Sequence, residues 1–156
     1  MPYIEGERSG APCLFCEMLA RPDGPDNLIL YRSPRAFVIL NRFPYNNGHM
    51  MVVPNAHRAS LEDLEAPDQA ELMALSGQAI TVLRQAYGAD SFNLGVNIGE
   101  SAGAGIVDHV HMHVLPRWAG DTSFMATTAE TRVIPESLEV TYQRLRPIWE
   151  ATAQGA

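Results

Sequence analysis

Three histidines alternate with apolar residues in one short stretch of the chain, at His109, His111 and His113. Successive side chains of a strand point to opposite faces, so a strand over residues 107–115 would place the three imidazoles on one face and the apolar side chains on the other. Buried imidazoles need polar partners, so their face has to meet water, a metal ion or a ligand. A neutral imidazole is a competent nucleophile near neutral pH, and neighbouring imidazoles can donate protons to phosphate oxygens.

Two other interpretations of this stretch compete with nucleophilic catalysis. A solvated strand face would carry histidine in place of threonine or glutamine, and a zinc or iron site would use all three imidazoles as ligands. The preceding loop, residues 99–105, consists mostly of small residues and contains Gly103 and Gly105. The backbone N–H groups of such a loop can approach a phosphate closely. Together, the loop and the histidine stretch favour a site for a phosphorylated ligand.

The two cysteines of the chain form a Cys-x-x-Cys pair at Cys13 and Cys16. This spacing allows a redox pair, a zinc half-site or a disulfide. A redox pair of the thioredoxin kind follows a buried strand, and residues 1–12 contain no strand pattern. A structural disulfide is disfavoured in the cytoplasm, and zinc needs two further nitrogen or sulfur ligands. The pair alone leaves these interpretations open.

Apolar patterning predicts the elements that position these residues. Five strands are expected, over residues 28–32, 36–40, 50–53, 92–98 and 107–115. A helical stripe begins near Pro67 and ends at Gly88. Residues 135–149 predict a C-terminal helix that Pro147 kinks or ends. Strands joined by short loops, with one long helix inserted, are typical of an antiparallel sheet in the α+β class.

Composition restricts the class of protein. The chain has 156 residues, which suits a single domain over residues 1–156. Its net charge of -7 disfavours a nucleic acid partner, because that function needs a basic surface. The first residues lack the pattern of a signal peptide, and no apolar stretch reaches the roughly 20 residues of a membrane helix. We therefore expect a cytoplasmic protein without membrane association.

The order His-φ-His-φ-His-φ-φ, where φ is apolar, resembles the signature of the histidine triad (HIT) superfamily of nucleotide-binding proteins, and residues 109–115 fit it at every position. Residues 40–44 and 48–54 resemble the second signature of the same family. The resemblance covers a core motif region, residues 13–118, and leaves residues 119–156 as a C-terminal extension. Residues 113–118 are most similar to prokaryotic members that act as diadenosine tetraphosphate phosphorylases or hydrolases.

The resemblance implies a role for each matching residue. His111 would attack the α-phosphorus of a nucleotide and form a nucleotidyl-histidine, while a backbone carbonyl holds its other ring nitrogen. His113 would contact phosphate oxygens and help the leaving group depart. Further contacts to the nucleotide are expected from Asn41, His49, Asn97, Gly103 and Gly105.

The resemblance also completes a metal site around the cysteine pair. Zinc-bearing members of the family combine their Cys-x-x-Cys with a histidine that follows the third strand and with the first histidine of the triad. The implied ligands of a structural zinc ion are therefore Cys13, Cys16, His57 and His109. Members of the family are commonly dimers, so a homodimer is expected.

The implied activity is that of a nucleotidyltransferase or hydrolase that cleaves diadenosine polyphosphates, with diadenosine tetraphosphate as the leading substrate. One departure bears on the acceptor, because many relatives carry Gln or Gly-Gln-Ser before the triad, whereas residues 104–106 read Ala-Gly-Ile here. The resulting space and free backbone donors favour phosphate slightly over water. The alternatives are a nucleoside phosphoramidase acting on AMP derivatives and a nucleotide-binding or partner-binding protein with little activity.

Overall fold

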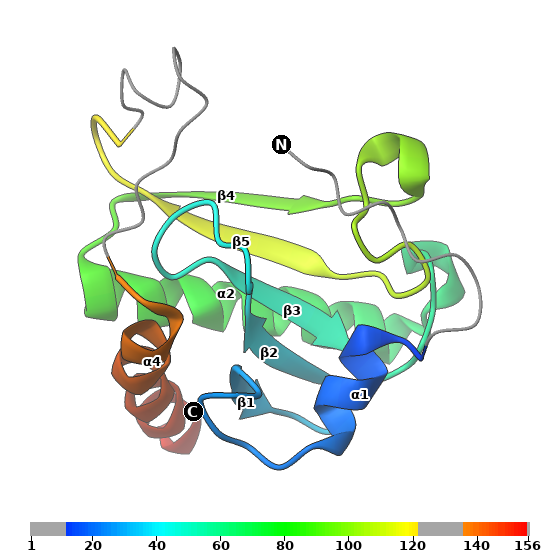
Figure 1. The fold of residues 1–156 in the computed structure, drawn as a ribbon, viewed down its shortest axis with the longest axis horizontal. Helices are drawn as coiled ribbons and strands as arrows, with labels where there is room; N and C mark the ends of the chain where they lie inside the picture. Colours follow the sequence, from blue (N-terminus) through cyan, green and yellow to red (C-terminus); the bar gives the residue numbers. More distant parts are fainter. Residues whose placement is uncertain (1–11, 122–135, 156) are drawn as a thin grey trace.

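The computed structural model describes residues 12–121 and 136–155, and its centre is a five-stranded antiparallel sheet (Figure 1). The order of the strands across the sheet is β1-β2-β3-β5-β4. The bounds of the strands are β1 Ile29–Arg32, β2 Ala36–Leu40, β3 Met50–Pro54, β4 Ser91–Val96 and β5 Met112–Arg117. This architecture confirms the predicted α+β class.

The long helix, α2 (Ala66–Tyr87), packs along one face of the sheet, against β2, β3 and β5. The C-terminal helix, α4 (Leu138–Gln154), packs beside α2 and against β1. A short helix, α1 (Leu14–Ala20), lies at the other end of the sheet from α4 (Figure 1). Two single 3₁₀ turns, Leu61–Asp63 and Glu100–Ala102, occur in the loops. None of the helices in the described residues is long and apolar enough to span a bilayer.

Helix α2 has the boundaries that its sequence predicts. Pro67 lies in the first turn, where its missing N–H costs no hydrogen bond. The helix ends at Gly88, which has a φ of 59° and donates its N–H to the carbonyl of Arg84. Between these ends, a stripe of apolar side chains faces the core, namely Leu72, Leu75, Ala79, Val82 and Leu83.

Helix α1 was not expected from the sequence. It has only seven residues, and the side chain at its N-cap, Cys13, makes no capping hydrogen bond. A helix this short is not stable by propensity alone. Phe15 and Met18 are buried in the core on its inner side, so tertiary packing is what stabilises it.

The strand that carries the histidines begins later than predicted. The expected strand over residues 107–115 is wrong at its start, because β5 begins at Met112, and residues 107–109 form turns and a bend. The pairing with β3 ends at Val52 and Met112, since Pro54 has no N–H to continue the ladder. The carbonyl of Pro54 instead accepts a hydrogen bond from Nε2 of His109 at 2.8 Å. The N–H of Val110 donates to Arg58 at 2.7 Å, outside the sheet.

The C-terminal helix also differs from the prediction. Pro147 lies inside α4 and does not end it, because the helix continues to Gln154. A proline inside a helix costs about 3 kcal/mol. The buried face of α4 extends across the proline and includes Leu145 and Trp149, and the indole of Trp149 stacks on the ring of Tyr31 with centroids 5.4 Å apart. Packing on both sides of Pro147 therefore holds the helix together.

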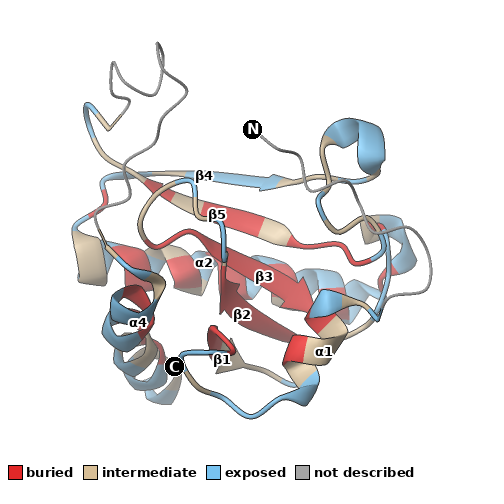
Figure 2. Cartoon of the chain, viewed as in Figure 1, coloured by how far each residue is buried: buried red, intermediate tan, exposed pale blue. Residues whose placement is uncertain are grey.

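The register of the sheet determines which side chains meet on each face. Leu40, Met50 and Val114 lie opposite one another on β2, β3 and β5. The next row contains Ile39, Met51 and His113, whose side chains point to the opposite face. The first row belongs to the core beneath α2, so the second row, with the histidine, lies on the face that α2 leaves free. Figure 2 shows that the central strands are buried, whereas most of β4 is exposed.

Candidate active site

A cavity of about 730 Å³ lies where α1, the central strands and several connecting loops meet. Its polar lining includes most of the residues that the sequence predicts to bind nucleotide: Asn41, Asn97, Gly103, Gly105, His111 and His113. Its apolar lining includes Phe15 and Met18 from α1 and Ile39 and Met51 from the sheet. Apolar walls with a few polar groups at one side are typical of a small-molecule site.

The imidazole of His111 is fixed in one tautomer. Its Nδ1 lies 2.9 Å from the carbonyl oxygen of His109, and because a carbonyl only accepts, Nδ1 carries the hydrogen. Nε2 of the neutral ring therefore keeps its lone pair. Burial lowers the pKa of His111 below its ordinary value, which keeps the ring neutral near pH 7. Phe15 packs edge-on against this ring, with centroids 5.0 Å apart.

A second chain of hydrogen bonds determines the tautomer of His113. The backbone N–H of Tyr45 donates to Nδ1 of His49 at 3.1 Å, so the hydrogen of the neutral His49 ring is on Nε2. That Nε2–H donates to Nδ1 of His113 at 2.9 Å. His113 then carries its own hydrogen on Nε2, the nitrogen that is left to donate to a ligand. Burial, with the neighbouring imidazoles adding to it, lowers the pKa of His49 to about 3 and that of His113 to about 4.

His49 has a different place from the one that the sequence suggested. Its side chain is 1% exposed and does not line the cavity. It contacts His113 and Tyr45, with ring centroids 5.1 Å and 4.6 Å away. His49 therefore lies behind His113 and Tyr45, both of which line the cavity.

The loop before the histidines lines the cavity, and some of its backbone N–H groups are unpaired within the described part of the chain. Within it, the N–H groups of Ala102, Gly103 and Ala104 bond to carbonyls of the same loop. The next two N–H groups, those of Gly105 and Ile106, find no acceptor among the described residues, and both residues line the cavity. Consecutive free N–H groups form a concave site for an anion.

Several lining residues were not anticipated from the sequence. Phe15 and Met18 belong to the unpredicted α1, although their spacing of three residues is a helical signal. Arg42 and Phe43 are exposed at the cavity, next to the predicted Asn41. Asn41 accepts the N–H of Phe43 on its Oδ1 at 2.9 Å, so its amide group remains free to donate.

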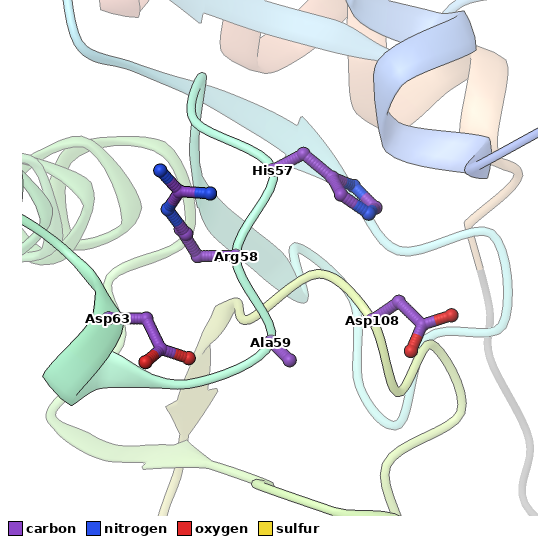
Figure 3. A pocket seen from close by; sticks show the side chains of 5 residues that line it. All are labelled: His57, Arg58, Ala59, Asp63 and Asp108. Atoms are coloured by element: carbon purple, nitrogen blue, oxygen red, sulfur yellow. The ribbon is translucent and has the colours of Figure 1, made fainter.

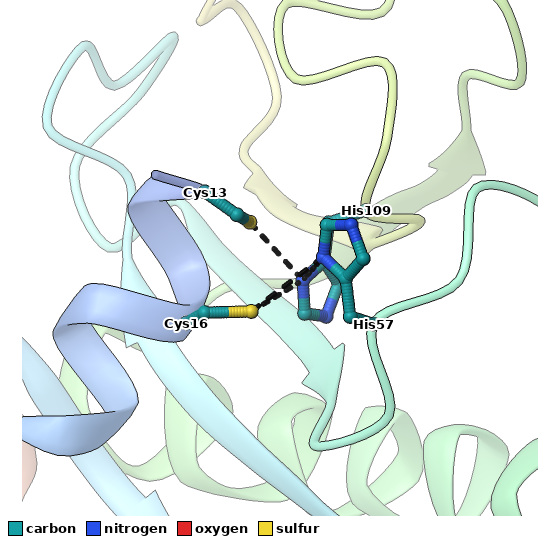
Figure 4. Close-up of side chains that lie close together, drawn as sticks. All are labelled: Cys13, Cys16, His57 and His109. Atoms are coloured by element: carbon teal, nitrogen blue, oxygen red, sulfur yellow. Dashed lines mark hydrogen bonds between the residues drawn. The ribbon is translucent and has the colours of Figure 1, made fainter. Parts of the chain in front are cut away.

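Four potential metal ligands meet beside the cavity (Figure 4). Their donor atoms, the Sγ of Cys13 and Cys16 and the Nδ1 of His57 and His109, all lie within 4.8 Å of one another. The Nδ1 atoms of the two histidines are 3.3 Å apart, and the contacts from sulfur to nitrogen measure 3.3 to 3.7 Å. Around a tetrahedral zinc ion, two nitrogens are separated by about 3.3 Å and a sulfur and a nitrogen by about 3.5 Å.

The donor set fits a metal ion in chemistry as well as in geometry. Both cysteines are free thiols, and His109 directs its Nδ1 into the cluster because its Nε2–H is bonded to Pro54. A second hydrogen bond of this kind is the usual way in which a ligating histidine is oriented. This cluster could hold a metal ion. It also brings the start of α1 into contact with the segment that carries His109, His111 and His113.

A second, more open hollow of about 530 Å³ lies beside His57 (Figure 3). It is lined by His57, Arg58, Ala59, Asp63 and Asp108. Two carboxylates against one guanidinium do not suit a polyphosphate, because like charges repel. The larger cavity is therefore the candidate active site.

Residues 24–120 match the model of the HIT domain family. The chain is 40% identical over 124 residues to AP-4-A phosphorylase of Mycobacterium tuberculosis, a match that spans 80% of this chain and 64%, less than two thirds, of the relative. It is 32% identical over 125 residues to adenylylsulfatase HINT3 of Arabidopsis thaliana, across 76% of this chain and 62% of that protein.

Among solved structures, the fold matches a Zn-bound histidine triad family protein of Mycobacterium smegmatis with a TM-score of 0.74. The sequence identity to that protein is 27%, and the match covers 92% of this chain and 97% of the other. The chain belongs to the HIT family. These matches confirm that the stretch of alternating histidines, residues 109–115, is a histidine triad signature. They also confirm the HIT-like fold that this resemblance implied.

Proposed function

We propose that this protein cleaves dinucleoside polyphosphates, with diadenosine tetraphosphate as the leading substrate, through a nucleotidyl-histidine on His111. One observation carries the proposal: His111 faces the cavity with its hydrogen held on Nδ1 by a carbonyl, which leaves a nucleophilic lone pair on Nε2. The similarity to AP-4-A phosphorylase supports the choice of substrate.

In the first step, Nε2 of His111 attacks the α-phosphorus in line. A P–N bond forms, and the bond from the α-phosphorus to the bridging oxygen breaks, so that ATP leaves from diadenosine tetraphosphate. Nε2–H of His113 would donate to the oxygens on which charge develops, and the hydrogen bond from His49 to Nδ1 of His113 supports this role. The free N–H groups of Gly105 and Ile106 would stabilise the same charge.

In the second step, an acceptor attacks the adenylyl-histidine and restores the neutral imidazole. With inorganic phosphate the product is ADP, and with water it is AMP. We favour phosphate, because Gly105 leaves open space: a Cβ atom built on it would meet no atom within 4 Å. A glutamine side chain in that space would occupy the place of a second anion.

We also propose that the cluster of Cys13, Cys16, His57 and His109 holds zinc. The Zn-bound family member of Mycobacterium smegmatis supports this choice of metal. When bound, the ion would supply a cross-link and no redox chemistry, because zinc has no accessible second oxidation state. His109 would thereby fix the carbonyl that orients His111. Thiolate ligands also suit the reducing cytoplasm, the expected location.

A product assay tests the proposal. The protein is incubated with diadenosine tetraphosphate, with and without inorganic phosphate, and the nucleotides are separated. ADP plus ATP in the presence of phosphate supports phosphorolysis, and AMP plus ATP indicates hydrolysis through the same adenylyl-histidine. Two ADP would show hydrolysis in the middle of the phosphate chain, which does not pass through that intermediate. No turnover under either condition would contradict the proposed activity.

The same nucleophile could serve a different leaving group. The relative named adenylylsulfatase HINT3 suggests a sulfate-activated AMP, and the expected alternative is a phosphoramidate. Adenosine phosphoramidate and adenylyl sulfate are therefore run beside diadenosine tetraphosphate. A higher kcat/KM for either one would reassign the substrate and keep His111 as the nucleophile.

A further inference from the structure

The side chain of Asn27 is buried without a hydrogen-bond partner. The residue is 4% exposed and lines the active-site cavity. Neither its Oδ1 nor its Nδ2 has a partner among the described residues, and both atoms are inaccessible to solvent. A buried amide that lacks both partners is costly to the folded protein. A ligand that enters the cavity lined by Asn27 would supply the partners once the side chain turns toward it.

The surroundings of Asn27 are held in a fixed and strained arrangement. The N–H groups of Asn27 and Leu28 both donate to the carbonyl of Gly24 at 3.1 Å. Leu28 has a φ of 62°, a left-handed conformation that an ordinary side chain adopts only at a cost. Leu28 also lines the cavity, and its carbonyl accepts the N–H of Leu40 at 3.0 Å. This places Asn27 at the end of the cavity bounded by β1.

The distance from Asn27 to the histidines suits a nucleotide. His113 lies on β5, and Asn27 lies just before β1, three strand spacings away across the sheet. Three spacings of about 4.8 Å amount to roughly 14 Å, which is on the scale of a nucleoside monophosphate. Asn41 follows β2, which lies between β1 and β5 in the sheet, and lines the cavity, so it would face the middle part of such a ligand.

We propose that Asn27 recognises the edge of the adenine base, an inference that rests on the proposed function and specifies the substrate. The carboxamide presents one donor and one acceptor side by side. Adenine presents the complementary pair on either edge: its exocyclic amino group beside N1 or N7. The bidentate pairing of asparagine with adenine is familiar from DNA recognition. The apolar side chains of Phe15, Leu28 and Ile39 would contact the faces of the ring.

The test compares binding by the wild type and by Asn27→Leu, a variant of similar shape without the amide. The probes are AMP, purine riboside 5′-monophosphate, which lacks the exocyclic amino group, and ribose 5-phosphate, which lacks the base. We expect Asn27→Leu to weaken AMP binding on the order of tenfold to a hundredfold. Ribose 5-phosphate should bind equally to both proteins. The wild type should prefer AMP to the purine analogue, and the variant should bind the two within about twofold.

A stability measurement distinguishes recognition from a structural role. Since the unpaired amide disfavours the folded state, Asn27→Leu should melt at the same temperature as the wild type or higher. Asn27→Ala removes the same amide without added bulk and should give the same order of affinities. Gln78→Leu is the matched control, because the Nε2 of Gln78 is also buried without a partner but does not line the cavity. It should leave all three affinities unchanged.

Three results would overturn the inference. AMP affinity within twofold of the wild type in both Asn27 variants would show that the amide does not contact the base. If the Asn27 variants lost the same factor of affinity for AMP and for ribose 5-phosphate, Asn27 would only shape the cavity. If the wild type bound AMP no better than ribose 5-phosphate, adenine recognition would fail as a whole, whereas turnover of diadenosine tetraphosphate would still be measured separately.

Discussion

At the scale of single residues, the site depends on where each histidine carries its hydrogen. The carbonyl of His109 and the N–H of Tyr45 impose opposite tautomers on His111 and His49, because one is an acceptor and the other a donor. The result is a lone pair on His111 and a donor on His113. Backbone groups thus prepare both rings before any ligand binds.

Replacing His111 tests its role as the nucleophile. His111→Asn should lower kcat by several orders of magnitude, because it removes the covalent route rather than one contact. The affinity for AMP and the melting temperature should change little. Steady-state kinetics, AMP titration and thermal unfolding measure the three quantities. Activity above a few per cent of the wild type would show that the reaction does not pass through His111.

The buried His49 predicts how stability depends on pH. Its pKa is about 3 in the folded protein, below the ordinary value of an unfolded chain, so the unfolded state binds more protons between these values. The free energy of unfolding therefore falls as the pH drops below about 6.5, by up to about 1.4 kcal/mol per pH unit from this group.

The matched variant for this pH dependence is His49→Asn, which keeps the four potential metal ligands, Cys13, Cys16, His57 and His109. Acid also protonates these ligands, but that contribution to the free energy of unfolding is common to both proteins. The decrease in melting temperature between neutral and mildly acidic pH should be smaller in the variant. An identical decrease in the two proteins would show that His49 does not contribute.

The sequence predicted some of these residues better than others. The alternation at positions 109 to 113 is a local pattern, and it correctly grouped His111 and His113 at one cavity although only His113 lies within β5. Asn27 was not predictable, since its burial depends on contacts between the α1–β1 connection and a distant strand. His49 was predicted to contact the nucleotide, because the sequence around it does not reveal that the side chain of His113 lies between it and the cavity.

At the scale of elements, α1 connects the proposed metal site to the histidine segment. Cys13 is its N-cap and Cys16 lies in its first turn, and Phe15 between them packs against His109 and His111. The sequence showed the cysteine spacing but not the helix, because seven residues give too little periodicity. The early end of the β3–β5 ladder was likewise missed, since the effect of Pro54 depends on which residue lies opposite.

Removal of a cysteine tests the metal cluster. The purified protein should contain about one zinc ion per chain, and Cys13→Ser or Cys16→Ser should lose it. The melting temperature should then fall by about 10 °C, because a structural ion contributes directly to folding. Ala20→Ser, at the end of the same helix, should change neither value. Elemental analysis that finds no zinc in protein purified without chelator would contradict the site.

The loop before the triad determines the acceptor in our proposal. Gly105→Gln should reduce phosphorolysis more than hydrolysis, so that the ratio of ADP to AMP falls at millimolar phosphate. The backbone of Gly105 has no positive φ, so the substitution needs no strained conformation. Gly77→Gln, exposed on α2, is the control. A ratio that stays unchanged in Gly105→Gln would show that this space does not hold the phosphate.

At the scale of the whole molecule, the sheet has an open edge. Strand β4 pairs with β5 on one side and with no other strand among the described residues. Its side chains are largely exposed, including Leu94 at 41%. An uncovered edge with apolar side chains favours pairing with another chain, which supports the expected homodimer.

Light scattering after gel filtration measures the oligomeric state. The wild type should have twice the chain mass of 17.1 kDa, and Leu94→Lys should shift it toward the monomer. Met73→Lys, a control that is 61% exposed on α2, should remain a dimer. A wild type that elutes with the mass of one chain would contradict the proposed dimer.

The central claim is the covalent nucleotidyl-histidine, and direct observation of the adduct tests it best. The protein is mixed with diadenosine tetraphosphate without phosphate, quenched rapidly under alkaline conditions and analysed by intact and peptide mass spectrometry. An adduct with the mass of one adenylyl group is expected on His111; it should disappear on addition of phosphate with release of ADP, and it should never form in His111→Asn. Turnover by the wild type without any adduct, or an adduct on another residue, would contradict this claim.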